Sequence, residues 1–407
     1  MENPAEGEQA VLNPNFALAQ RLYEYESTQR FSESKHGVVD IPDDIRDMIQ
    51  NESMAPYYKM VCTKYSWHFD EAFYEQMSGE NEKKFAEIER KLEDAIERAG
   101  DMEILDAIFE KAKLFSAIGD FPASLKVYDD IISREKTGTG RKIDAWMAKA
   151  RIALFDVSMS SLKEYIAESK RLVELGGDWD RRNRLKVYEA LYLITRRDIH
   201  AAAELLLECV ATFSCTELCS YKTFMFYTII TNIMSLPRSK LEKSLVRNSN
   251  VISVMRELPD TKQLLLSIYN CDYHTFFAEL GNAYEQISRD RYLGLHSTYI
   301  IREFRVLAYS QFLEAYRSVL LSSMATSFGL SSIVLDQELS RFISSGRLHA
   351  KIDKVGDVVE NCRPDKKNAQ YQEIIKKGDV LLNSVQKLGK YFGLFLIVIF
   401  NYILSIF

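Results

Sequence analysis

The chain has few of the residues that interrupt helices, and its cysteines form no recognisable pair. Its 407 residues include only eight prolines, seventeen glycines and six cysteines. So little proline and glycine indicates a chain that is mostly helical. The cysteines, at positions 62, 209, 215, 219, 271 and 362, contain no CxxC spacing. We therefore expect reduced, half-buried thiols in a cytosolic or nuclear protein, and no zinc at the cluster of positions 209, 215 and 219.

Catalytic and cofactor-binding motifs are also missing. No two of the six histidines lie within five residues of each other, which excludes the HExxH and HxH spacings of metal sites. The sequence has no GxSxG elbow and no Walker loop. Gly138–Lys142 has the glycines of a phosphate-binding loop, but it follows a helical pattern and lacks the Gly-Lys-Ser/Thr ending, so we interpret it as an interhelical loop. The sequence predicts no enzyme, no cofactor, no metal and no small-molecule substrate.

An excess of basic charge is missing too. The net charge is −6, from 58 acidic and 52 basic residues, which gives no hint of a nucleic-acid or anionic-membrane partner. Met1–Gln9 contains three glutamates and no apolar run, so no signal peptide is expected. The 47% hydrophobic and 27% charged residues are typical of a soluble globular protein. The length allows two or three domains, or one extended array of repeats.

Apolar residues recur with helical spacing along most of the chain. Three candidate turns, at Gly119–Phe121, Ser158–Ser160 and Arg197–Ile199, follow one another at intervals of about 39 residues. Around the first turn, the small residues Ala112 and Ser124 fall at the offsets of a tetratricopeptide (TPR) unit. The pattern favours an all-α solenoid of TPR-like helical hairpins. A set of unrelated helical hairpins is the alternative.

The C-terminal third indicates a different module. Residues 332–363 predict a helix, a Ser345–Gly346 turn and a two-stranded wing, which together end a winged helix. The two strands are expected near Arg347–Lys354 and Gly356–Asn361 and nowhere else in the chain. A helix over Tyr299–Leu321 is expected to begin the module.

The charge of this winged helix bears on what it binds. Its presumed recognition helix carries Asp336 and Glu338 and only Arg341 as a cation. A winged helix that reads DNA needs a basic face, because cations displace the counterions of the phosphates. This module is therefore predicted to bind protein and not nucleic acid.

A last helix is predicted over Asn368–Leu388. It carries a narrow apolar stripe, with Gly378 in one of its slots: Tyr371, Ile374, Leu381, Val385 and Leu388. Such a stripe on a terminal helix suits a bundle with helices of other chains. Packing back onto the chain's own solenoid is the alternative.

The final seventeen residues, 391–407, contain no charge. They differ in composition from everything before them. Three interpretations compete: a membrane tail anchor, a hydrophobic extension buried against neighbouring subunits, and translated intron at a mispredicted last exon. We favour the last, and we expect a membrane partner only if the tail is genuine.

These patterns divide the chain into six parts. They are an N-terminal helical region (1–78), TPR-like repeats (79–215), a helical continuation (216–294), the winged helix (295–363), a C-terminal bundle helix (364–390) and the hydrophobic tail (391–407).

Helical repeats that end in a winged helix are the arrangement of the PCI domain. The sequence resembles the PCI-domain subunits of the proteasome lid, whose relatives occur in the cullin-deneddylating signalosome and in translation initiation factor three. The longest segments that carry the resemblance are Gly176–Tyr188, Ala308–Arg317, Asp336–Ile343, Gly346–Lys354 and Arg363–Asp379. The N-terminal region matches more loosely but in the same order.

The resemblance implies a non-catalytic scaffold in the lid of the 19S regulatory particle, active in ubiquitin-dependent degradation in the cytoplasm and nucleus. In this family, winged helices join edge to edge and C-terminal helices gather into a bundle, so the implied partners are other PCI and lid subunits. The implied partner-binding residues are Arg347, Leu348, His349 and Lys351 of the wing, and Ile374, Leu381, Val385 and Leu388 of the last helix. A signalosome or translation-initiation PCI subunit is the alternative.

Overall fold

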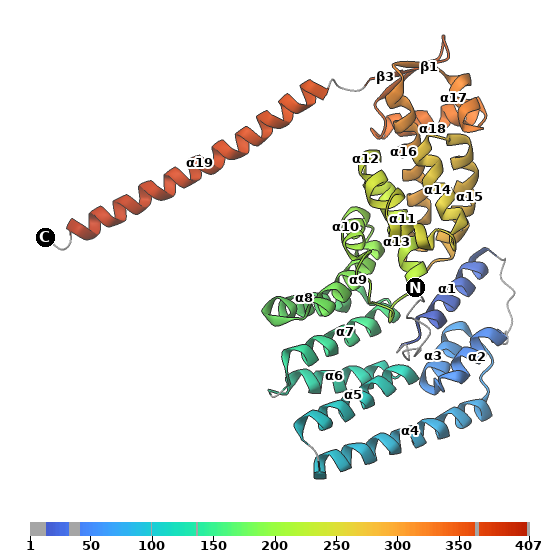
Figure 1. Ribbon diagram of the computed structural model, residues 1–407, viewed down its shortest axis with the longest axis vertical. Helices are drawn as coiled ribbons and strands as arrows, with labels where there is room; N and C mark the ends of the chain where they lie inside the picture. Colours follow the sequence, from blue (N-terminus) through green and yellow to red (C-terminus); the bar gives the residue numbers. More distant parts are fainter. Residues whose placement is uncertain (1–13, 32–40, 99, 136, 363–365, 405–407) are drawn as a thin grey trace. The chain divides into compact units, whose positions relative to one another are not determined.

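Helices make up most of the chain, as its low proline and glycine content predicts (Figure 1). The structure is a computed structural model, and it describes residues 14–31, 41–98, 100–135, 137–362 and 366–404. Two compact units are present, Met1–Ala308 and Tyr309–Phe407. The first unit holds the helical repeats and the second holds the winged helix and the terminal helix. The predicted fold class, an all-α solenoid followed by a C-terminal winged helix, is confirmed.

Among the residues that the structure describes, the first unit begins with four helices: α1 (Phe16–Phe31), α2 (Asp43–Asn51), α3 (Ala55–Tyr65) and α4 (Glu71–Arg98). A cluster of aromatic rings joins α3 to the repeats. The ring of Tyr57 lies 6.2 Å from that of Phe121 and 5.4 Å from that of Phe155. Phe73 and Met77 are buried near the N-terminal end of α4 and belong to the core of this unit.

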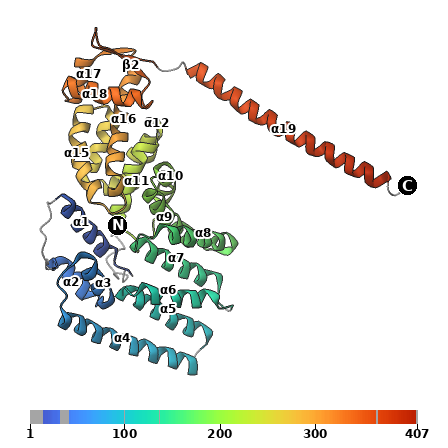
Figure 2. The same ribbon diagram turned by 180° about the vertical axis from the view of Figure 1, so that it is seen from behind.

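The three predicted hairpins are confirmed, and Figures 1 and 2 show them stacked in chain order. They are α5 (Asp101–Ile118) with α6 (Phe121–Ser133), α7 (Thr139–Phe155) with α8 (Met159–Gly176), and α9 (Trp179–Thr195) with α10 (Ile199–Cys209). At the first turn Gly119 adopts a φ of +88°, and a Cβ there would lie 2.5 Å from the Cβ of Tyr57. The buried Ser124 hydroxyl donates to the Ala112 carbonyl at 2.9 Å, which explains the small residues at this crossing.

Helices continue beyond the repeats, as expected for the 216–294 segment. They are α11 (Tyr221–Ser235), α12 (Arg238–Leu241), η1 (Glu242–Val246, a π turn), α13 (Ser249–Val254), α14 (Pro259–Asn270), α15 (Tyr273–Arg289), η2 (Gly294–His296) and α16 (Ser297–Ala315). Helix α11 begins at Tyr221, because the Ser220 hydroxyl accepts from the N–H of Thr223 and caps it.

The winged helix has one strand more than predicted. It consists of β1 (Ser318–Leu320), α17 (Leu321–Phe328), α18 (Ser332–Ser344), β2 (Ala350–Asp353) and β3 (Val358–Asn361). The three strands form an antiparallel sheet in the order β1-β3-β2. The helix predicted over Tyr299–Leu321 therefore ends at Ala315, and β1 takes the place of its last turn. Leu335, Leu339 and Val359 fill the core between the helices and the sheet.

The last helix, α19, runs from Lys366 to Leu404, well beyond the predicted end at Leu388. The uncharged segment thus continues the helix as far as Leu404. Within the described ranges, none of the helices combines the length and apolar character needed to cross a membrane.

Candidate functional site: an interaction surface

The first candidate surface is the edge of the winged-helix sheet. Strand β2 pairs with β3 on one side only, with Lys351 opposite Glu360. The N–H of Cys362 donates to the His349 carbonyl at 2.9 Å and holds the start of this strand against its neighbour. On an edge strand, alternate backbone groups face outward and can pair with another chain.

Three of the four wing residues singled out from the sequence lie on the surface. The side chains of Arg347, His349 and Lys351 are exposed, whereas Leu348 is only 5% exposed and belongs to the core of the winged helix. Leu348 therefore supports the surface from below. Sequence reasoning missed this alternation because the turn after α18 shifts which residues face inward.

The carboxylates of α18 are engaged within the winged helix. Asp336 pairs with Lys354, and the Tyr309 hydroxyl donates to Glu338 at 2.7 Å. These contacts use the acidic residues of the presumed recognition helix to fasten neighbouring elements. Arg341 is the single basic residue within Ser332–Ser344, where a phosphate-binding face would need several.

The second candidate surface is the apolar stripe of α19. The four residues singled out from the sequence are all exposed by more than half: Ile374, Leu381, Val385 and Leu388. Ile375 and Leu382 lie beside them and are each 56% exposed. Ile375 and Leu382 are seven residues apart, so they lie on one side of the helix and make its apolar face wider than the predicted stripe. The sequence analysis missed these two, although their spacing was visible.

A third feature, inside the solenoid, is a buried ionic cluster around Glu217. Its carboxylate accepts from the guanidinium groups of Arg151 on α7 and Arg184 on α9, the latter at 2.6 Å, and from the Tyr188 hydroxyl. Burial alone would raise the Glu217 pKa, but the two cations and the hydroxyl outweigh it and hold the pKa below its ordinary value. The cluster ties the segment before α11 to two successive repeats.

The Gly138–Lys142 segment is structural as well. Gly138 precedes the first turn of α7, and Arg141 pairs with Asp106 at 2.5 Å while its guanidinium lies over the Phe109 ring. The interpretation as an interhelical loop is therefore wrong from Thr139 onward, where α7 begins. The contacts of Arg141 join α7 to α5.

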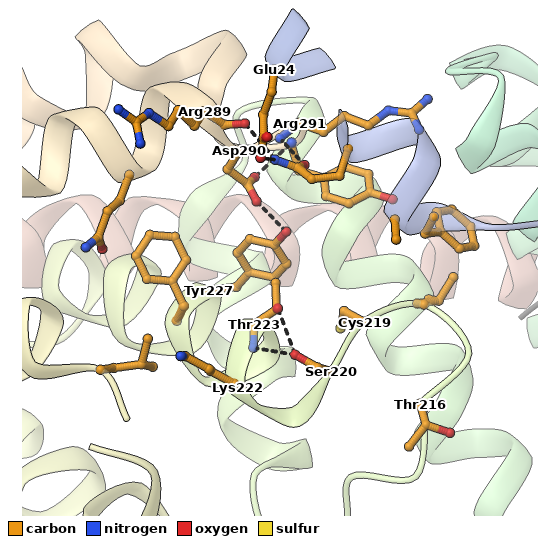
Figure 3. Close-up of a pocket in the computed structure, with 18 of the residues that line it drawn as sticks. Glu24, Thr216, Cys219, Ser220, Lys222, Thr223, Tyr227, Arg289, Asp290 and Arg291 are labelled. Carbon is orange, nitrogen blue, oxygen red and sulfur yellow. Dashed lines mark hydrogen bonds between the residues drawn. The ribbon is translucent and has the colours of Figure 1, made fainter. Parts of the chain in front are cut away.

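A cavity of about 730 Å³ is lined by α1, the 216–220 segment, the start of α11 and residues 286–292. Figure 3 shows the side chains around it. Its polar groups are largely engaged with one another. Asp290 accepts from the Tyr227 hydroxyl at 2.6 Å and from the N–H groups of Tyr292 and Leu293. Burial raises the pKa of the Asp290 carboxyl. Gln20 donates to the Arg289 carbonyl and fastens α1 to the end of α15.

The thiol of Cys219 on the same cavity wall is not activated as a nucleophile. Burial raises the pKa of the Cys219 thiol to about 12, which disfavours the reactive thiolate. The part of the chain that the structure describes holds no cluster of three His, Cys, Asp or Glu side chains able to bind a metal ion. What the geometry provides is an exposed sheet edge at β2 and an exposed apolar stripe on α19.

A solenoid of helical hairpins that carries a winged helix defines the PCI class, and the PCI domain model matches residues 281–361. Two narrower family models also match. The model of the 26S proteasome subunit RPN7 matches residues 70–244, and that of the RPN7/PSMD6 C-terminal helix matches residues 370–391. The chain belongs to the family of 26S proteasome non-ATPase regulatory subunit 6, also called Rpn7.

Curated relatives extend this match over nearly the whole chain. The subunit 6 homologue of Arabidopsis thaliana is 38% identical over 390 residues, 96% of this chain and 99% of its own length. The rice protein is 37% identical over 94% of this chain and 98% of its own length. The Rpn7 subunit of Schizosaccharomyces pombe is 37% identical over 93% of this chain and 96% of its own length.

The alternative of a signalosome subunit is not favoured. Subunit 1 of the Arabidopsis thaliana COP9 signalosome is 26% identical over 147 residues, only 36% of this chain. The uncharged segment after residue 391 lies beyond the match of the C-terminal helix model.

Proposed function

We propose that this chain is a non-catalytic scaffold of the proteasome regulatory particle lid and supports ubiquitin-dependent protein degradation. The observation that carries the proposal is the match to the regulatory subunit 6 homologue of Arabidopsis thaliana over 96% of the chain. The proposed partners are other PCI and lid subunits, and the proposed location is wherever proteasomes work, in the cytoplasm and nucleus.

We assign two surfaces to this role. The wing edge, defined by Arg347, His349 and Lys351 with Leu348 beneath them, would meet the sheet of a neighbouring winged helix through backbone pairing. The α19 stripe, which includes Ile374, Leu381, Val385 and Leu388, would enter a bundle with helices of other subunits. Both surfaces are exposed in the isolated chain, as an assembly surface must be.

The proposal is tested by mass spectrometry of native complexes captured through an N-terminal tag on the chain. Recovery of lid and proteasome base subunits in fixed stoichiometry is the expected result. Recovery of cullins and signalosome subunits would move the chain to the paralogous complex. Recovery of the chain alone, from cells in which tagged lid subunits assemble normally, would overturn the scaffold role.

A further inference from the structure

One residue of the α19 stripe does not fit the others. Gly378 lies seven residues after Tyr371 and seven before Val385, so it faces the same side of the helix as these two large residues. Ile374 and Leu381 stand one turn to either side of it on this face. The stripe therefore has a gap at the level of Gly378, bordered by large apolar side chains.

The chain itself supplies no reason for this glycine. Glycine in a helix interior costs about 0.5–1 kcal/mol relative to alanine. At Gly119 the reason for glycine is visible, because φ is positive and Tyr57 stands in the way. Gly378 has helical backbone, and a Cβ built there would meet no atom of the described chain within 4 Å. Glycine is used where another molecule approaches the backbone closely, and the place of Gly378 in the middle of the exposed stripe fits that use.

We propose that Gly378 is the seat for one large apolar side chain from a helix of another subunit. The inference rests on the proposed scaffold function and deepens it. In packed helices a side chain of one helix enters the hole between four residues of the next. Absence of a side chain at Gly378 deepens such a hole, while Ile374 and Leu381 form its walls. The seat would fix the register between α19 and its partner.

The charge of α19 identifies the kind of helix that fits. Residues 367–392 contain five lysines and only two acidic residues, Glu373 and Asp379. A second copy of α19 would bring two basic helices together, which like-charge repulsion disfavours. The occupant is therefore an amphipathic helix with acidic flanks on a different subunit, and its apolar face carries a large residue at the level of Gly378.

The test is a size series at this position in full-length, N-terminally tagged chains. Wild type, Gly378→Ala and Gly378→Leu each compete with an untagged wild-type chain for incorporation into the regulatory particle. Incorporation is expected to fall in the order Gly, Ala, Leu, with the leucine variant reduced about tenfold or more, since overfilling a packed site is destabilising. Alanine and leucine both favour a helix more than glycine does, so a loss of helix cannot explain lower incorporation of either variant than of wild type.

Asn383→Leu is the matched control, because residue 383 is exposed on the side of α19 away from Gly378. It should incorporate like wild type, and circular dichroism of the free chains should show no loss of helix in any variant. Equal incorporation of Gly378→Leu and wild type would overturn the seat while leaving the scaffold role intact. Failure of wild type to incorporate would overturn the scaffold role. Wild-type dimers in sedimentation that Gly378→Leu abolishes would overturn the choice of occupant.

Discussion

Glu217 shows what a single buried carboxylate does in a solenoid. It lies in a segment without regular structure, yet it contacts the first helices of two successive hairpins through Arg151 and Arg184. Its side chain is 18% exposed, so water screens the pair only partly. Removing one partner of such a cluster leaves charges buried without compensation, which costs more than the intact pair contributes.

Glu217→Gln is therefore expected to lower the free energy of unfolding by about 3 kcal/mol. Urea denaturation at neutral pH, followed by circular dichroism, measures the change. Glu208→Gln is the matched control, since Glu208 is 59% exposed and pairs with Lys186 on the surface. That change should cost about 1 kcal/mol or less. Equal effects of the two substitutions would show that the Glu217 cluster is not a stabilising centre.

The stabilisation by Glu217 should also depend on pH. Its pKa in the folded chain is lower than the value of 4.5 expected when unfolded. The ionised carboxylate therefore stabilises the fold above this value, and the contribution is lost as the pH falls through the lower pKa of the folded state. The difference in urea midpoint between wild type and Glu217→Gln should be largest near neutral pH and should shrink below about pH 4.5. A difference that grows on acidification would contradict the assigned pKa direction.

Two glycines predict opposite effects of the same substitution. Gly119→Ala should destabilise the chain by at least about 1 kcal/mol, because it combines a left-handed backbone with a clash against Tyr57. Gly281→Ala should stabilise it by about 0.5–1 kcal/mol, since Gly281 lies inside α15 and a Cβ there would meet no atom of the described chain within 4 Å. Thermal unfolding of both variants measures the two signs. A stabilising Gly119→Ala would show that the first turn is not as tight as described.

At the level of elements, the helices and turns that depend on neighbouring residues were predicted best from the sequence. The three hairpin turns were found because Gly119, Ser158 and Asp198 stand where helices end or begin. Strand β1 was missed because only three residues form it, and its pairing of Val319 with Val359 across 40 residues is what makes it a strand. The sequence around β1 alone does not indicate that β3 is its pairing partner.

Among the candidate surfaces, too, those defined by local spacing could be predicted from the sequence and those that depend on distant contacts could not. The stripe of α19 could be predicted because helical spacing alone defines it, whereas the burial of Leu348 depends on the turn between α18 and β2. The cluster around Glu217 was not predicted, because its partners come from residues 33 and 66 positions away. Contacts between segments that are distant in the sequence can be identified only from the three-dimensional structure.

The winged helix should depend on its core leucine and phenylalanine. Leu339 is fully buried and Phe342 is 9% exposed, so Leu339→Asp or Phe342→Asp would bury an unpaired charge at roughly 4 kcal/mol or more. Either variant is expected to lose the protection of β2 and β3 in hydrogen exchange. Ile333→Asp, at a position 74% exposed on the same helix, is the control and should fold normally. If the Leu339→Asp variant melted cooperatively and kept the full hydrogen-exchange protection of β2 and β3, Leu339 would not belong to the core of the winged helix.

At the scale of the whole molecule, folding and assembly should be separable. Replacing Leu381 and Val385 together with Asp changes only exposed positions of α19, so the melting temperature of the free chain should stay within experimental error of wild type. Incorporation into the regulatory particle should be lost, because two charges would enter the proposed bundle. Native gel electrophoresis of tagged regulatory particles measures the incorporation of the double variant. Normal incorporation of the double variant would remove α19 from the assembly interface.

The exposed stripe of α19 also has a consequence for the supply of this chain in a cell. A copy that has no partners displays contiguous apolar side chains, the feature that invites aggregation and attracts chaperones and proteases. A copy within its complex would hide them. The lifetime of the chain should then follow the abundance of its partners, so that surplus copies are cleared within a short time while assembled ones persist.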